Sequence, residues 1–391
     1  MNNQSVTSDE RPATSDQQRA TSNQLGVCMH GVKLTVESDH APLLAHATEH
    51  LHNMIEPAST NPDLVVRCLW SQGEWDEQAN PFQIDGALNV IGKRMLGKTD
   101  DLIWLDTLRM KGLQLRFRRD PGYWNFEVAY RFHPKKEKLD NLPEYEYKRY
   151  FSLMSYLVYY PLIWYLENFR GWTIFHASAL AFDKLGLPGM SRSNTSGSAS
   201  LSSAGLMIGG LGGVGKTTTC VALMQRPGIR LISENIIFTD GEFIYPCDEP
   251  IRLDDGSLAM LGENPAGLIP MNFPEGLKDK SLFHLEPASH SEKVKPAALF
   301  LPQFSARRYL TPLAPESTVE KMIAMNRLTR ELDDYGWYAA ALEMHWPRPG
   351  HAEKRLEVLH RFAQNARGYE LGIDRTAGVG AVVEDILKTV L

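Results

Sequence analysis

Residues 209–219, with the sequence GGLGGVGKTTT, have the residue types and spacing that hold the phosphates of a nucleotide. They match the phosphate-binding pattern G-x-x-x-x-G-K-[ST]. Its glycines let consecutive backbone N–H groups turn toward an anion, Lys216 brings a positive charge to the β- and γ-phosphates, and the Thr217 hydroxyl is a ligand for Mg²⁺. We predict that ATP and Mg²⁺ bind here, through Gly210, Leu211, Gly212, Gly213, Val214, Gly215, Lys216, Thr217 and Thr218.

The segments on either side of this loop favour the same interpretation. The short apolar run 206–208 predicts a strand, and residues 217–225 predict a helix that ends before Pro227 and Gly228. A helix that begins at the loop points the positive end of its dipole at the bound phosphates.

A second set of polar residues follows the next predicted strand, 229–233, which ends in Glu234 and Asn235. An acidic residue at a strand end beside a phosphate loop holds the metal or accepts the proton of the attacking hydroxyl. A carboxamide ligates Mg²⁺ through its oxygen but accepts no proton. We therefore predict Glu234 as the general base, and Thr217, Glu234 and Asn235 as the metal ligands.

Segments 176–180 (HASAL) and 230–235 (RLISEN), together with the loop, resemble the catalytic domain of HPr kinase/phosphorylase, and more narrowly the HPr-kinase-related proteins of the kinase B type. The likeness covers about residues 171–253 and leaves 1–150 unmatched. It implies an α/β phosphate-loop kinase domain similar to the HPr kinase C-terminal domain and to phosphoenolpyruvate carboxykinase, which phosphorylates serine on a protein or peptide and forms homo-oligomers. It also implies a catalytic role for His176 beside Lys216 and Glu234, while Asn235 stands where the family has a second acid. No segment matches the family's signature for phosphorolysis.

The chain divides into segments of different composition. We predict a disordered tail over 1–25, an α+β N-terminal domain with a recognition role over 26–150, and the catalytic domain over 151–391, with a mobile Ser/Gly-rich insertion at 183–204. The apolar run 151–166 contains serines and a proline and is too short to cross a membrane, so it predicts a buried helix. Further predicted strands are 32–36, 64–70, 113–117, 124–132, 172–182 and 297–301; a hairpin joins 236–239 to 242–245 through the two-residue turn Asp240-Gly241; further predicted helices are 41–55, 317–328, 353–366 and 378–391.

Composition excludes several classes of function. The net charge of −6 over 391 residues is unlike a nucleic-acid-binding protein, which presents a basic surface. Four cysteines without C-x-x-C spacing indicate reduced thiols rather than disulfides or a zinc site. The first two dozen residues contain no apolar stretch typical of a secretory signal. We expect a cytoplasmic protein with no membrane partner.

Other motifs leave alternatives open. Residues 46–50 (HATEH) match the H-x-x-E-H pattern of some zinc proteases, and we interpret them as an exposed helix face. Arg252 and the pair Arg307-Arg308 are further candidates for neutralising a transferred phosphate. Two alternative functions remain: a nucleotide-binding NTPase or regulatory module without an acceptor, and a kinase for a small-molecule hydroxyl.

Overall fold

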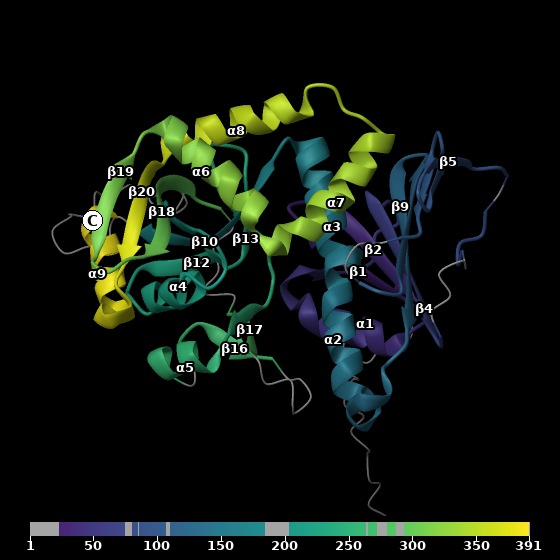
Figure 1. Ribbon diagram of the computed structural model, residues 1–391, viewed down its shortest axis with the longest axis horizontal. Helices are drawn as coiled ribbons and strands as arrows, with labels where there is room; N and C mark the ends of the chain where they lie inside the picture. The colour runs from purple at the N-terminus through teal and green to yellow at the C-terminus, as the bar shows by residue number, and fades with distance from the viewer. Residues whose placement is uncertain are drawn as a thin grey trace, which may run out of the picture.

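The computed structural model describes residues 23–74, 80–84, 86–106, 110–183, 203–262, 265–271, 280–286 and 293–390. Within these ranges the chain is mixed α/β, and a long helical segment lies between two large sheets (Figure 1). Both large sheets contain parallel and antiparallel neighbours. The α/β class predicted from the sequence is confirmed, while the closer likeness to a phosphate-loop kinase stays a prediction.

The first sheet, here called the N-terminal sheet, has the strand order β3-β1-β2-β4-β9-β8-β7-β6-β5. Strands β2, β4 and β9 run parallel at its centre. Val32, Leu34 and Val36 alternate along β2 and are fully buried, as expected for a strand with one face in a core. In chain order its strands are β1 (Gln24–Met29), β2 (Val32–Ser38), β3 (Ile55–Glu56), β4 (Leu64–Gln72), β5 (Asn89–Gly92), β6 (Met95–Lys98), β7 (Asp101–Trp104), β8 (Leu113–Asp120) and β9 (Tyr123–Phe132).

A continuous helical segment, residues 142–170, packs on this sheet and shares its core together with α1 (Ala41–His50). It comprises α2 (Leu142–Met154), a π-helical turn (Ser155–Tyr159), α3 (Tyr160–Tyr165) and a second π-helical turn (Leu166–Arg170). The first π turn comes just before Pro161, whose ring clashes with the carbonyl four residues earlier and widens the helix. Leu157, Leu162 and Ile163 are fully buried, so the buried helix predicted over 151–166 is confirmed.

The second sheet, here called the phosphate-loop sheet, has the order β14-β13-β10-β11-β18-β20-β19, and β12 also pairs with β10. Strands β11, β18 and β20 are parallel, as in sheets that are covered by helices on both faces. Its strands are β10 (Thr173–Asp183), β11 (Ser203–Gly209), β12 (Ile229–Ser233), β13 (Ile236–Thr239), β14 (Ile244–Pro246), β18 (Lys295–Phe304), β19 (Tyr309–Leu313) and β20 (Arg367–Ile373).

Helices cover both faces of the phosphate-loop sheet (Figure 1). Leu206 and Ile208 of β11 pack with α4 (Lys216–Met224) and α9 (Gly378–Val390). Met207, between them in the sequence, packs on the opposite face with α6 (Pro315–Leu328) and α8 (His351–Asn365). The alternation of side chains along a strand therefore divides β11 between two helical layers.

A small third sheet, β15-β17-β16, lies beside α5 (Asp255–Leu261) at the lower edge of Figure 1. Its strands are β15 (Ile251–Leu253), β16 (Leu268–Pro270) and β17 (Ser281–Leu285). Short 3₁₀ turns occupy His52–Met54, Lys136–Asn141 and Arg375–Ala377. Among the described residues, no helix combines the length and apolar character needed to cross a membrane.

Several predicted elements differ from the structure. The helix predicted over 41–55 ends at His50, and Ile55–Glu56 pairs with β1 instead. Thr239 pairs with Ile244, so the connection between β13 and β14 consists of residues 240–243 and is longer than the predicted two-residue turn. The Asp240 carboxylate causes this, because it accepts the backbone N–H groups of residues 242 and 243, at 2.8 Å each.

The structure differs from the sequence-based predictions at three further places. Helix α7 (Arg330–His345), which we did not predict, contributes Leu332, Tyr335 and Leu342 to the core of the N-terminal sheet. Strand β1 begins at Gln24, inside the predicted tail. Residues 1–22 of that tail and 184–202 of the insertion lie outside the described residues, while the ends of the insertion belong to strands β10 and β11.

Candidate functional site

Strand β10 is the frame of the candidate site. On one edge it pairs with β11, where Ala177 lies opposite Gly209, the last residue before the phosphate loop. On the other edge it pairs first with β13 and then with β12, where Ala179 lies opposite Ser233. Residues 234–235 connect these two strands. The pairing therefore brings the phosphate loop and the connection 234–235 to the same part of β10.

The phosphate loop has the backbone conformation that its glycines permit. Gly210, Gly213 and Gly215 have φ values of 133°, 80° and 86°, in a region that other residues rarely adopt. Lys216, the first residue of α4, is buried, and its Nζ donates to the carbonyls of Gly210 and Leu211 at 3.0 Å each. The lysine charge therefore lies against the loop backbone, where the bound phosphates are predicted.

Two hydroxyls donate hydrogen bonds to Glu234, one from the loop and one from β10. Thr217 Oγ1 donates a hydrogen bond to Glu234 Oε1, and Ser178 Oγ of β10 donates one to the Glu234 backbone carbonyl. Glu234 is only 8% exposed. The hydroxyl of Thr218, the next residue of the predicted loop set, bonds instead to Ser257 of α5, at 2.7 Å. The structure thus brings together Thr217 and Glu234, two of the three predicted metal ligands, and their role as ligands stays a prediction.

His176 and Asn235 belong to a hydrogen-bonded chain next to Glu234. Asn235 Nδ2 donates to Glu249 Oε2 at 2.8 Å, so the amide oxygen of Asn235 faces His176 Nε2, at 3.1 Å. The Nε2 atom of His176 therefore donates a hydrogen bond to this oxygen. On the other side of the ring, Nδ1 lies 3.0 Å from Thr329 Oγ1, and the backbone N–H of His176 donates to Asn326.

The donor set fits Mg²⁺. Hydroxyl and carboxylate oxygens are the ligands this ion prefers, and it is usually held by one or two protein groups together with phosphate oxygens. Thr217 and Glu234 supply such a pair at the loop. The described residues contain no group of three or more His, Cys, Asp or Glu side chains arranged to hold a metal by themselves. Asn235, the third predicted ligand, has its amide engaged with His176 and Glu249.

A cavity of about 210 Å³ lies beside this chain, and we call it the Asn235 cavity. It lies where four parts of the fold meet: the end of α1, the helical segment 142–170, the first turn of α7, and the segments 235–236 and 249–252. Its lining residues include His50, Ser155, Asn235, Glu249, Arg252 and Arg330. Arg252, one of the candidate arginines, therefore does lie near the predicted site.

The other two candidate arginines do not line this cavity. Arg308 forms an ion pair with Asp385 of α9 at 3.6 Å, and Arg307 is exposed in the turn between β18 and β19. Glu249 and Thr329 complete the hydrogen-bonded chain, yet sequence reasoning missed them. Glu249 stands in the unremarkable sequence Asp-Glu-Pro, and Thr329 ends α6, far away in the chain, so no local signal marks either residue.

The H-x-x-E-H segment is not the exposed face that we expected. His46 and His50 lie in the helix as predicted, but they are 7% and 2% exposed, because α1 packs under the helical segment 142–170. Burial lowers the pKa of His46 to about 4 and the pKa of His50 well below its ordinary value. Both rings are therefore neutral at pH 7.

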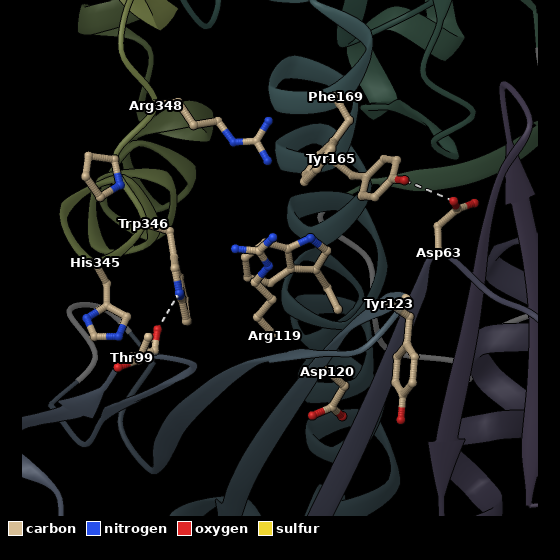
Figure 2. Close-up of a pocket in the computed structure, with 13 residues that line it drawn as sticks. Asp63, Thr99, Arg119, Asp120, Tyr123, Tyr165, Phe169, His345, Trp346 and Arg348 are labelled. Atoms are coloured by element: carbon tan, nitrogen blue, oxygen red, sulfur yellow. Dashed lines mark hydrogen bonds between the residues drawn. The ribbon is translucent and has the colours of Figure 1, made fainter.

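A larger cavity, about 580 Å³, lies elsewhere on the molecule, and none of the predicted site residues lines it (Figure 2). Trp124 and Trp346 meet edge to face across it, with ring centroids 5.1 Å apart. The Arg348 guanidinium lies 3.8 Å from the centroid of the Phe169 ring, and burial lowers the pKa of Arg348. Figure 2 also shows the Tyr165 hydroxyl directed at Asp63. The recognition role predicted for the N-terminal part stays a prediction, and this cavity is a place to test it.

Comparison of the sequence with protein-family models and with curated proteins finds no match. The resemblance to HPr kinase therefore rests on the residues quoted above.

Proposed function

We propose that this chain is an ATP-dependent, Mg²⁺-dependent kinase that transfers the γ-phosphoryl group to a hydroxyl. One observation carries the proposal: the Thr217 hydroxyl of a phosphate loop is hydrogen-bonded to the carboxylate of Glu234, which follows β12, the next strand along the chain. A phosphate loop alone predicts nucleotide binding, whereas a loop joined to a buried carboxylate supplies the two parts that phosphoryl transfer requires.

Each residue has a defined part in the proposed reaction. The loop amides and the N-terminus of α4 bind the phosphates, and Lys216 neutralises charge on the β- and γ-phosphates. Thr217 and Glu234 hold Mg²⁺, which when bound offsets the charge that develops on the phosphate oxygens. His176 keeps Asn235 in place through its Nε2–H, and the amide of Asn235 in turn holds Glu249. Positioning and charge stabilisation supply most of the catalysis in such a reaction.

The resemblance to HPr kinase suggests serine on a protein or peptide as the acceptor, and a small-molecule hydroxyl is the alternative. A cytoplasmic location suits the chain, because Cys28, Cys68, Cys220 and Cys247 are all unpaired thiols.

The test is transfer of label from γ-labelled ATP with Mg²⁺ into a lysate of the source cells, beside direct measurement of ATP affinity. We expect Lys216→Ala to weaken ATP binding about 10- to 100-fold, because it removes charged hydrogen bonds to phosphate. We expect Glu234→Gln to abolish transfer and to weaken binding chiefly in the presence of Mg²⁺. Lys354→Ala, on the exposed side of α8, is the matched control and should change neither.

The outcomes separate the proposal from its main rival. ATP binding that depends on Lys216, with no labelled acceptor of any size, would favour an NTPase or a nucleotide-responsive module. Failure to bind ATP at all would overturn both.

A further inference from the structure

The Asn235 cavity points to the kind of acceptor that the proposed kinase uses. It is lined by Asn235 and Glu249. Asn235 directly follows Glu234, which accepts the hydrogen bond from Thr217, and Asn235 itself binds Glu249. At roughly 30 Å³ per water in the liquid, about 210 Å³ holds about seven waters. That is room for a molecule of amino-acid size, and too little for a folded protein surface.

The N-terminal part of the chain packs against the strands beside the site. Ile236 and Phe238 of β13, and Cys247 just after β14, belong to the hydrophobic core of the N-terminal sheet. His30 Nε2 lies 2.7 Å from the carbonyl oxygen of Pro246. His50, from the N-terminal part of the chain, forms part of the wall of the Asn235 cavity.

The charges around the cavity indicate what the small molecule carries. Arg252 forms no hydrogen bond or ion pair with any residue in the described ranges, and its guanidinium lies 5.9 Å from the Phe151 ring. Arg330 lines the same cavity. Two acids also line the cavity: Glu249 accepts a hydrogen bond from Asn235, and Asp334 accepts one from Tyr156 at 3.2 Å. An arginine without an acid partner at a cavity wall is a site for a carboxylate.

We propose, on the basis of the proposed kinase function, that the acceptor is a small alcohol bearing a carboxylate, which binds in the Asn235 cavity. Arg252 holds the carboxylate, and the hydroxyl lies at Glu249. In the reaction the hydroxyl proton passes to the Glu249 carboxylate and the hydroxyl oxygen bonds to the γ-phosphorus of ATP. The bond from that phosphorus to the β–γ bridging oxygen breaks, and ADP leaves with its electron pair. Glu234, engaged by Thr217, serves the metal instead of the proton.

The first experiment determines the size of the acceptor. Lysate is labelled with γ-labelled ATP and the purified protein, then passed through a membrane that retains proteins, and the filtrate is resolved by anion exchange from ATP and free phosphate. We expect a new labelled anion in the filtrate. Label confined to the retained protein would overturn this proposal and leave the kinase intact, whereas no transferred label in either fraction would overturn the kinase itself.

The second experiment tests the residues with defined probes. ADP formation is followed with glycerate, L-serine and L-threonine, with glycerol as an alcohol without a carboxylate, and with a serine-containing peptide. We expect a carboxylate-bearing alcohol to stimulate ADP formation, and glycerol and the peptide to leave it unchanged. Stimulation by the peptide or by glycerol, without stimulation by any of the acids, would overturn the proposal.

Variants then separate binding from chemistry. Arg252→Ala should raise the KM for the stimulating acid about 10- to 100-fold with kcat little changed. Glu249→Gln keeps the side-chain length and should lower kcat about 10²- to 10⁴-fold, with ATP affinity unchanged. Arg170→Ala is the matched control, because Arg170 is an exposed arginine at the end of the helical segment 142–170 and does not line the cavity. An unchanged KM in Arg252→Ala, with ATP affinity showing that the variant is folded, would contradict the assignment.

Discussion

At the scale of single residues, Asn235 is the departure from the HPr kinase pattern that the structure explains best. Its amide lies between two side chains: the amide oxygen accepts a hydrogen bond from His176 Nε2, and Nδ2 donates one to Glu249 Oε2. An aspartate here would accept only, and it would face the carboxylate of Glu249. The structure thus supplies from Glu249 a carboxylate that the sequence lacks at position 235.

We therefore expect Asn235→Asp to destabilise the protein at pH 7, although it restores the residue of the HPr kinase pattern. Two carboxylates at hydrogen-bond distance raise the pKa of one of them, and the lost amide bond costs about 1–3 kcal/mol of unfolding free energy. Because the folded state then binds the extra proton more tightly, stability should recover as the pH falls. Urea denaturation at several pH values measures this.

The double variant Asn235→Asp, Glu249→Gln is the control for this prediction. It again pairs a carboxylate with an amide, so its unfolding free energy should return toward the wild-type value. An Asn235→Asp single variant as stable as the wild type at pH 7, with the same pH dependence, would contradict the account.

Buried His46 predicts an acid-sensitive fold. Its pKa is about 4 in the folded state and about 6.5 when exposed, so below pH 6.5 the unfolded chain binds the proton first. The protein should lose about 3 kcal/mol of unfolding free energy from this group as the pH falls from 7 to 4. His46→Leu should remove that part of the pH dependence in urea titrations, while His360→Leu, on an exposed part of α8, should keep it.

At the scale of elements, periodicity and loop chemistry predicted most of the strands and helices around the site. Strand 229–233 agrees with β12, and the predicted helix 217–225 is α4 shifted by one residue. Helix α7 was missed, although Leu332, Tyr335, Ala339 and Leu342 repeat at helical spacing and are buried. Gly336 and two adjacent aspartates obscured that signal.

The sequence could not predict contacts that arise only from the packing of distant elements. The phosphate loop is local, so eleven consecutive residues were enough to predict it. Glu249 reaches Asn235 because β14 returns beside β13, and Thr329 reaches His176 across 153 residues of chain. The Asn235 cavity likewise exists only where α1, α7, the segment 142–170 and the segments 235–236 and 249–252 meet.

The N-terminal sheet contains a buried ion network that predicts a large effect of one substitution. Arg116 of β8 donates to both oxygens of Asp101, at 2.9 and 2.8 Å, and to Glu127 at 3.0 Å. The side chains of Arg116 and Asp101 are 5% and 3% exposed. Arg116→Met should lower the free energy of unfolding by about 3–5 kcal/mol, because it leaves two carboxylates together without their cation.

Chemical denaturation with an exposed control tests that prediction. Arg67 forms an ion pair with Glu37 of similar length, 2.8 Å, but its side chain is 53% exposed. Arg67→Met should therefore cost less than about 1 kcal/mol. Equal losses in the two variants would show that burial does not set the strength of the Arg116 network.

At the scale of the whole molecule, the two sheets are joined through a shared interior. The core of the N-terminal sheet includes side chains from β13 and from α7, which lie after the phosphate loop in the sequence. Glu167, 1% exposed in the helical segment, accepts a hydrogen bond from Tyr335 of α7 and pairs with Arg355 of α8 at 3.2 Å. Burying this carboxylate is favourable only while both partners are present.

We therefore expect one cooperative unfolding transition for the full chain. Tryptophan fluorescence, which reports on the N-terminal sheet through Trp124, and loss of ATP binding should have the same midpoint in denaturant. A fragment 151–391, cut at the boundary predicted from the sequence, should aggregate, because it removes most of α2 and exposes Leu157 and Leu162. A monomeric, ATP-binding fragment would contradict this expectation.

The late position of α7 in the chain has a consequence for biosynthesis. The N-terminal sheet and the helical segment 142–170 leave the ribosome long before Leu332, Tyr335 and Tyr338, which complete their core. At 5–20 residues per second, the wait from residue 166 to residue 332 is roughly ten to thirty seconds. During that interval the nascent chain exposes an unfinished apolar surface, so its yield in the cell should depend on chaperones that protect it until α7 arrives.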